Sequence, residues 1–156
     1  MSTKPRQATR GARTKVLEAQ LYEPVFSLPL FRDQMVSVTR EVAFYRKRVD
    51  LVWLTARGDL VAVELKVRDW KRVLWQASIN QLFADFSYVA VWHRALKFLD
   101  LMLLKQRGIG VIVIQENGAR TVRRASRSPL LRTVHREAVL EALAPTNGAA
   151  TLEAVS

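Results

Sequence analysis

The chain has 156 residues, of which 49% are hydrophobic, so its length suits one domain with a hydrophobic core and its composition excludes a wholly disordered protein. It contains no cysteine, which excludes a disulfide framework and a thiolate metal site. No apolar run approaches the length of a membrane span, and the basic N-terminus lacks the apolar segment of a secretory signal. We therefore expect a cytoplasmic protein that contacts no membrane.

The formal net charge of +11 is unevenly distributed. Two segments, residues 1–15 and 120–136, contain several lysines and arginines and no acidic residue. Such an excess favours a polyanionic partner, nucleic acid first, because contacts with phosphates release counterions. A solvated basic surface or an acidic protein partner are the alternatives.

The first part of the chain predicts a basic arm, a helix and a strand. Residues 1–12 are polar, basic and without periodicity, which is typical of a disordered arm. Apolar residues at near-helical spacing predict a helix over 14–26, which ends before Pro29. A strand is expected over 36–45, and a hairpin over 50–66 follows it.

The second part alternates helices and strands. Asp69 is expected to be the N-cap of a helix over 70–83. The further elements that we expect are a strand over 87–92, a helix over 94–106 that stops at Gly108, a strand over 109–114, a turn at Asn117-Gly118 leading into a basic strand or loop up to Arg127, and a helix over 135–143. The tail from 144 to 156 is small, polar and expected to be flexible, so residues 13–143 form the single predicted domain. This order predicts an α/β protein with a mixed central sheet flanked by helices.

The hairpin over 50–66 has charged residues in strands that are otherwise apolar. A two-residue loop at Arg57-Gly58 would place Asp50 opposite Leu65, whereas a three-residue loop over 56–58, with a left-handed glycine, would place Asp50 opposite Glu64. Only the three-residue loop buries both apolar faces, because a shift of one residue moves every side chain to the other face of the sheet. We therefore expect Asp50, Glu64 and Lys66 to lie together on one patch of sheet.

The residues Arg48-Val49-Asp50-Leu51-Val52 and Val63-Glu64-Leu65-Lys66 resemble the signature of the PD-(D/E)XK nuclease superfamily. The resemblance covers about 14–92 and implies a restriction-endonuclease-like core in the order α-β-β-β-α-β. The sequence departs from the motif at Val49, which replaces the proline.

The chemistry of these residues agrees with that resemblance. Asp50 and Glu64 are hard oxygen ligands of the kind that Mg²⁺ or Mn²⁺ prefers. A bound cation of this kind generates hydroxide and stabilises charge on a phosphodiester. The resemblance implies that the backbone carbonyl of Leu65 is a further ligand and that Lys66 positions the attacking water. A surface ion-pair cluster is the alternative, although charges within apolar strands need a compensating role.

Two further site residues are expected from the neighbouring elements. Resembling proteins often use an additional carboxylate from the first helix or strand, for which Glu41, Glu18 and Glu23 are candidates. We prefer Glu41, with Glu18 as its rival and a solvent-facing edge glutamate as the alternative. Gln76 resembles a polar residue beside the metal in several branches, and Asn80 shares its helix face, where one branch has tyrosine.

The resemblance and the charge together predict a metal-dependent deoxyribonuclease. The residues that we expect to contact nucleic acid are Arg13, Lys15, Arg48, Lys71, Arg123, Arg124 and Arg127. The helix over 94–106 is apolar around most of its circumference, so it is either well buried or part of a homodimer interface. A catalytically silent DNA-binding or regulatory protein of the same fold is the alternative, and a small α/β protein that contacts RNA is a third hypothesis.

Overall fold

A computed structural model describes residues 18–29 and 34–144 of the chain. The predicted arm over 1–12, the predicted contacts Arg13 and Lys15, and the tail from 145 onward lie outside these residues. Among the described residues, no helix is long and apolar enough to cross a membrane.

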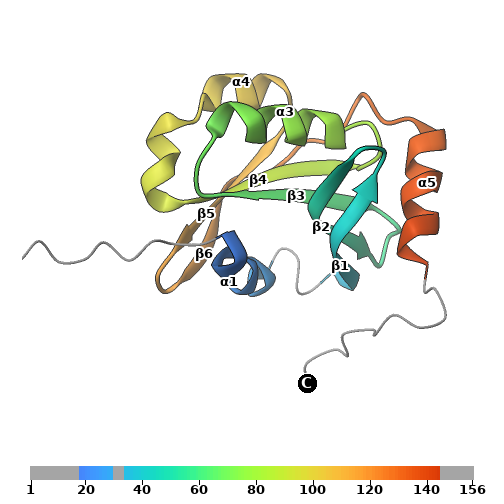
Figure 1. Cartoon of the computed structure of the whole chain (residues 1–156), viewed down its shortest axis with the longest axis horizontal. Coiled ribbons are helices and arrows are strands. Elements are labelled where there is room, and N and C mark those ends of the chain that lie inside the picture. Colours follow the sequence, from blue (N-terminus) through green and yellow to red (C-terminus); the bar gives the residue numbers. More distant parts are fainter. Residues whose placement is uncertain (1–17, 30–33, 145–156) are drawn as a thin grey trace, which may run out of the picture.

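The described chain is built on one six-stranded mixed sheet (Figure 1). Its strands are β1 (Met35–Phe44), β2 (Lys47–Thr55), β3 (Leu60–Lys66), β4 (Phe86–Trp92), β5 (Gly110–Gln115) and β6 (Gly118–Arg123), and they lie side by side in chain order. The pairs β1–β2, β2–β3 and β5–β6 are antiparallel, whereas β3–β4 and β4–β5 are parallel. The parallel pairs need crossover connections, and these connections contain helices.

Helices cover both faces of this sheet (Figure 1). They are η1 (Glu18–Leu21), α1 (Tyr22–Phe26), α3 (Trp70–Asn80), η2 (His93–Phe98), α4 (Leu101–Gln106) and α5 (Thr133–Leu143). Helices α3 and α4 lie over one face, α1 lies under the other, and α5 stands beside β1 (Figure 1). The order α1, β1, β2, β3, α3, β4 is the expected α-β-β-β-α-β core, so the predicted α/β class is confirmed.

Side-chain alternation along β3 divides the core between the two faces. Val63 and Leu65 pack in a cluster with Leu21 and Val25 on the α1 side. On the other side, a cluster that includes Val73 and Ala77 of α3 packs against β4 and β5. A third cluster joins β1, β2 and α5 through residues such as Phe44, Phe83 and Val139. Glu64 alternates with Val63 and Leu65, so it belongs to the α3 face.

The predicted helix over 94–106 is divided in two. The 3-10 helix η2 ends at Phe98, and α4 begins at Leu101 after Asp100, whose carboxylate accepts a hydrogen bond from the peptide N–H of Leu103 at 2.9 Å. An aspartate that caps a helix in this way starts a new helix instead of continuing the previous one. The two pieces are not buried all round, since Leu104 is buried while Phe98 and Met102 are more than half exposed.

Two further helix boundaries differ from those expected. Helix α3 ends at Asn80 instead of Phe83, and α5 begins at Thr133 instead of His135. The expected start of the first helix at residue 14 lies outside the described residues, and its described part begins with a 3-10 turn at Glu18. Asp69 is the N-cap of α3, as predicted, and accepts from the N–H of Arg72 at 3.3 Å.

Candidate metal centre

The turn between β2 and β3 has the predicted three-residue loop. Leu54 pairs with Leu60 and Leu51 with Val63, and continuing this register places Asp50 opposite Glu64. The loop closes through a hydrogen bond from the N–H of Thr55 to the carbonyl of Asp59 at 2.9 Å. Gly58 has φ +82, the left-handed conformation that glycine adopts without cost. The predicted register is confirmed.

Glu64 is fully buried under α3. Its Oε1 accepts two hydrogen bonds, from Asn80 Nδ2 at 2.7 Å and from Lys47 Nζ at 3.0 Å. Its Oε2 is also buried but accepts no hydrogen bond from the described chain. Such an oxygen carries the cost of desolvation unless a cation or the protonated carboxyl of Asp50 binds it.

Gln76 and Asn80 lie one turn apart on the face of α3 that covers Glu64. Both are buried. Asn80 uses both ends of its amide, because Oδ1 accepts from Lys47 Nζ at 2.7 Å while Nδ2 donates to Glu64. Gln76 Oε1, in contrast, is buried and accepts no hydrogen bond within the described chain. Helix α3 therefore provides a second unpaired oxygen.

Asp50 is held by the strand that carries Glu64, since its Oδ2 accepts from the N–H of Leu65 at 2.7 Å. Burial raises the pKa of Asp50 to about 7, and the negative charge of Glu64 raises it further. The N–H of Leu65 and the charge of Lys66 oppose this shift. The two carboxylates are thus close enough to repel each other, and a cation between them would relieve that repulsion.

Lys47 also belongs to the site, although the sequence analysis did not identify it. Besides Glu64 and Asn80, its Nζ donates to the backbone carbonyl of Gln76 at 3.1 Å. Burial lowers the pKa of Lys47, and Glu64 opposes that effect. The sequence pattern points to Lys47 only weakly, because Lys47 lies between two other basic residues, Arg46 and Arg48. Only the tight turn that pairs Phe44 with Lys47 points Lys47 inward.

Lys66 and Leu65 both lie next to Asp50. Lys66 is half-buried and close enough to Asp50 to affect its pKa. The peptide N–H of Leu65 binds Asp50, and a ligand role for its carbonyl stays a prediction.

Glu41 lies toward solvent, with its side chain 51% exposed. It accepts from Tyr22 Oη at 3.3 Å and lies 3.9 Å from Arg48. Glu23 is more exposed still and lies 3.8 Å from Arg40, while the side chain of Glu18 lies outside the described residues. Within the described part of the chain, no three His, Cys, Asp or Glu side chains are grouped to hold a metal. The described residues therefore bring together two carboxylates and an amide oxygen as candidate ligands, and a third carboxylate role for Glu41 stays a prediction.

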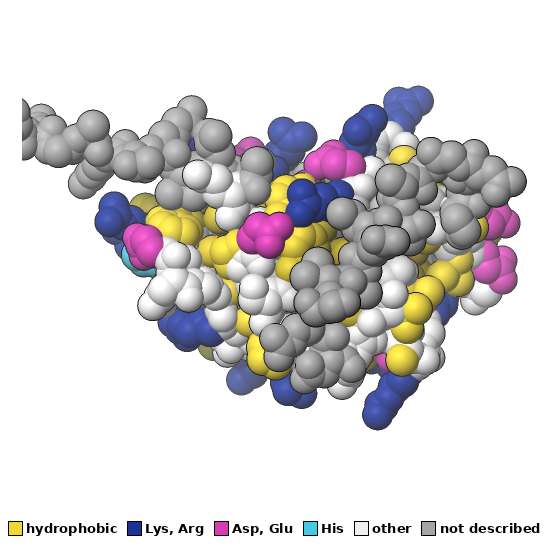
Figure 2. Space-filling model, turned by 90° about the horizontal axis from the view of Figure 1, so that it is seen from below, with side chains coloured by type: hydrophobic (Ala, Val, Ile, Leu, Met, Phe, Trp, Pro, Cys, Tyr) yellow, Lys and Arg dark blue, Asp and Glu magenta, His cyan; other side chains and the backbone are white. Residues whose placement is uncertain are grey.

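The residues predicted to contact nucleic acid differ in whether their side chains already bind other groups of the protein. Arg48 and Lys71 are exposed, and so is Arg124. Arg123 instead donates to the carbonyl of Leu101 at 2.6 Å, and Arg127 donates to Asp85 at 2.7 Å and Asp59 at 3.0 Å. These last two guanidinium groups therefore also serve the fold. On the α1 side of the molecule, lysine and arginine side chains lie around the edge of the face (Figure 2).

The residues present suit a divalent cation with hard oxygen ligands. Glu64 Oε2 and Gln76 Oε1 are buried oxygens without donors, and Asp50 is a carboxylate whose pKa is raised by burial and by the negative charge of Glu64. Mg²⁺ binds through one or two carboxylates and keeps several waters, so this small donor set is compatible with it.

Comparison with known proteins identifies a similar fold. No family model matches the chain, and no curated protein matches it significantly. A solved protein of unknown function from Silicibacter pomeroyi is 22% identical, with a TM-score of 0.51, over 69% of this chain and 70% of that one. A repair endonuclease from Pyrococcus abyssi is 18% identical, with a TM-score of 0.44, over 74% of this chain and 49% of that one, so the match spans about half of the endonuclease. The first likeness shows a shared fold alone.

Proposed function

We propose that this protein is a divalent-metal-dependent nuclease that hydrolyses phosphodiester bonds in DNA. The observation that carries the proposal is the pair of buried oxygens without donors, Glu64 Oε2 and Gln76 Oε1, next to a second carboxylate whose pKa is raised to about 7. An ordinary structural ion-pair cluster would not leave Gln76 Oε1 without a donor, nor bring two carboxylates together with a raised pKa on one of them. The resemblance of the sequence around Asp50, Glu64 and Lys66 to PD-(D/E)XK nucleases supports the same function.

In this proposal Asp50 and Glu64 hold Mg²⁺ or Mn²⁺, with the carbonyl of Leu65 as a further ligand and Gln76 beside them. The metal, when bound, lowers the pKa of a water and offsets charge on the phosphate. Lys66 orients the attacking water and balances the negative charge that develops on the phosphate. The N–H of Leu65 fixes the carboxylate of Asp50.

Lys47 and Asn80 are positioning residues in this account. They bind the same oxygen of Glu64, which fixes the carboxylate and leaves Oε2 as its unpaired atom. A carboxylate held in this way needs little reorganisation when a cation binds.

The net charge of +11 supports a nucleic acid as the substrate, and it supplies affinity without sequence specificity. Arg48, Lys71 and Arg124 are exposed and can contact phosphates. The choice of DNA over RNA rests on the resemblance to the nuclease superfamily.

Cleavage by purified protein tests the proposal. Supercoiled, single-stranded and branched DNA, together with RNA, are incubated with Mg²⁺, Mn²⁺ or EDTA. We expect cleavage of DNA with either metal and none with EDTA, and we expect Asp50→Ala and Lys66→Ala each to reduce the rate by at least about 100-fold.

The matched control is Glu137→Gln, because Glu137 is an exposed carboxylate on α5 that takes no part in the contacts of Asp50 and Glu64. This variant should cleave at the wild-type rate. Cleavage that survives both Asp50→Ala and Lys66→Ala would rule out the proposed centre. Tight, salt-sensitive DNA binding without cleavage under every metal condition would instead identify a silent DNA-binding protein.

A further inference from the structure

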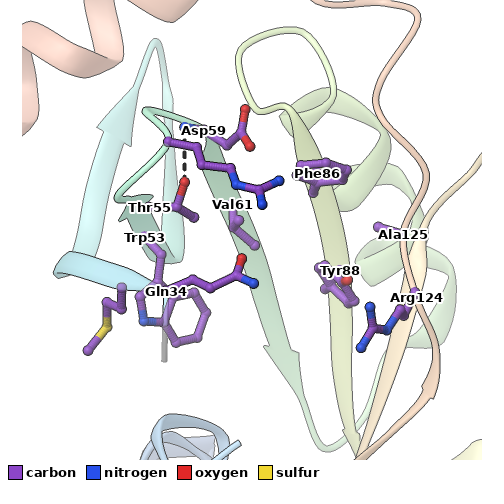
Figure 3. Close-up of a pocket in the computed structure, with 11 residues that line it drawn as sticks. Gln34, Trp53, Thr55, Asp59, Val61, Phe86, Tyr88, Arg124 and Ala125 are labelled. Atoms are coloured by element: carbon purple, nitrogen blue, oxygen red, sulfur yellow. Dashed lines mark hydrogen bonds between the residues drawn. The ribbon is translucent and has the colours of Figure 1, made fainter. Parts of the chain in front are cut away.

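A pocket lies near the start of β3, on the α1 side of the sheet that carries Trp53, Val61 and Tyr88 (Figure 3). Its volume is about 250 Å³. Strands β2, β3 and β4 line it, together with the β2–β3 loop, the segment after β6, Met35 at the start of β1 and the preceding Gln34. Nothing in the proposed metal centre uses this pocket.

Aromatic side chains form much of the apolar surface of the pocket. Trp53 and Tyr88 are buried in the sheet face, and Phe86 is half-buried beside them. Gly110 gives the ring of Tyr88 its space, because a Cβ at that position would lie 2.2 Å from a ring carbon. The guanidinium of Arg127 lies 4.9 Å from the centroid of the Phe86 ring. Trp53 and Tyr88, only 1% and 4% exposed, therefore form the packed floor of the pocket, and Phe86 is the ring among the three that a ligand can reach.

Polar groups enter the pocket from two sides (Figure 3). The side chains of Gln34 and Arg124 both point into it from opposite walls, and Arg57 also lines it. Asp59 is the acidic residue in the lining, and it is paired with Arg127 at 3.0 Å. The charge that the pocket offers to a ligand is therefore positive, next to an aromatic surface.

We propose that this pocket binds one nucleotide of a DNA strand, with the base against the Phe86 side chain and a phosphate at Arg57 and Arg124. Bases stack on aromatic side chains whatever their sequence, and arginine binds phosphate in a planar, bidentate way. Gln34 supplies an amide that can donate to and accept from a base edge. The volume lies just below the roughly 300–1,000 Å³ of most small-molecule sites, so it suits a single base better than a dinucleotide.

The pocket and the proposed metal centre lie on opposite faces of the sheet. Val61 lines the pocket on the α1 side, whereas Glu64, three residues further along β3, points toward α3. The pocket is therefore a nucleotide site separate from the metal centre. The assignment of DNA as the source of the nucleotide rests on the proposed function, whereas the binding chemistry does not.

The first experiment measures binding to the full chain in EDTA, where no cleavage takes place. Isothermal titration calorimetry measures the affinity of the protein for dAMP, deoxyadenosine and inorganic phosphate in separate titrations. We expect dAMP to bind at least tenfold more tightly than either of the other two, because it alone occupies the aromatic and the basic parts together.

Two variants locate that binding. Arg124→Ala removes an exposed charge and Phe86→Leu removes the ring while keeping an apolar side chain, and each should weaken dAMP binding at least fivefold. Arg120→Ala is the matched control, because Arg120 is an exposed arginine on β6 outside the pocket lining, and it should change binding less than twofold. Equal effects of Arg124→Ala and Arg120→Ala, equal affinity for phosphate and dAMP, or no binding of dAMP at 10 mM would each overturn the proposal.

A second arm identifies the source of the nucleotide. Two five-nucleotide DNA strands are compared, one intact and one without any bases, and the intact strand should bind at least fivefold more tightly to wild type but not to Phe86→Leu. If dAMP binds in the pocket while the two strands bind equally, the pocket takes free nucleotides and the strand assignment is wrong. These binding experiments contain no metal, so they can succeed even if the protein cleaves no DNA. Conversely, a protein that does not bind dAMP can still have a metal centre at Asp50 and Glu64.

Discussion

Lys47 Nζ lies 3.0 Å from Oε1 of Glu64, and the two side chains come from neighbouring antiparallel strands. Glu64 is fully buried and the side chain of Lys47 is only 13% exposed. A buried carboxylate needs such a partner, because an isolated charge is costly in the interior. The pair leaves the other oxygen of Glu64 for a cation, so one carboxylate serves both the fold and the proposed centre.

Replacing Lys47 by methionine should destabilise the protein. Removing one partner of a buried ion pair leaves an uncompensated charge and costs about 3–5 kcal/mol. Urea unfolding in EDTA measures this loss, and Lys71→Met, an exposed lysine at the start of α3, is the matched control. In the double variant with Glu64→Gln, the loss should be smaller than the sum of the two single losses. Additive losses would show that the pair contributes nothing as a pair.

The stability of the protein should depend on pH through Asp50. Its pKa in the folded protein is raised to about 7, so between about pH 4 and 7 the unfolded chain releases this proton before the folded chain does. Rising pH therefore reduces the free energy of unfolding in that range, by up to about 1.4 kcal/mol per pH unit, with no further loss above pH 7.

The variant Asp50→Asn should lack this dependence, since asparagine does not titrate. Urea titrations of wild type and variant from pH 4 to pH 8 in EDTA measure the difference between their free energies of unfolding. That difference should shift in favour of Asp50→Asn as pH rises. A constant difference across the range would mean that the pKa of Asp50 is not raised.

The β2–β3 loop should be sensitive to the loss of its glycine. Gly58 has φ +82, and a Cβ built on it meets no atom within 4 Å, so an alanine would be strained by its backbone alone. We expect Gly58→Ala to lower the free energy of unfolding by about 1–2 kcal/mol, and Gly58→Asn to lower it less, because asparagine tolerates this conformation. Thermal unfolding of both variants checks the order. Equal stability of the two variants and wild type would contradict the left-handed conformation.

The basic segment after β6 should divide into structural and nucleic-acid-binding arginines. Asp85 is buried and accepts from Arg127 at 2.7 Å, from Arg136 at 2.8 Å and from the N–H of Leu60 at 2.8 Å. Asp85→Ala should therefore cost about 1–3 kcal/mol of stability, because it leaves the buried N–H of Leu60 without an acceptor, while Arg124→Ala should leave stability within about 0.5 kcal/mol. In fluorescence anisotropy with labelled DNA, Arg124→Ala should weaken binding. A stable Asp85→Ala protein would show that this cluster does not support the fold.

The sequence predicted the parts of the site that depend on local rules. Alternation along β3 and the glycine in the loop determine which face Glu64 takes and what lies opposite it, so the register of Asp50 could be predicted. Lys47 could not be, because three basic residues follow one another there and only the turn after Phe44 selects one of them. The helix break at Asp100 was not predicted, because Asp100 lies within a run of apolar residues at helical spacing and its role as an N-cap cannot be recognised from that pattern. The ion pairs of Arg127 join residues 42 and 68 positions apart, and such separations leave no local pattern.

The binding of a divalent cation tests the central claim most directly. Mn²⁺ is titrated into wild type, Asp50→Asn, Glu64→Gln and the control Glu137→Gln, without DNA, and free Mn²⁺ is followed by electron paramagnetic resonance. Wild type and Glu137→Gln should bind one or two equivalents with equal affinity, and Mg²⁺ should displace them. Asp50→Asn and Glu64→Gln should each weaken binding at least tenfold. Binding by all four proteins with the same affinity, or by none of them, would contradict a metal centre at Asp50 and Glu64.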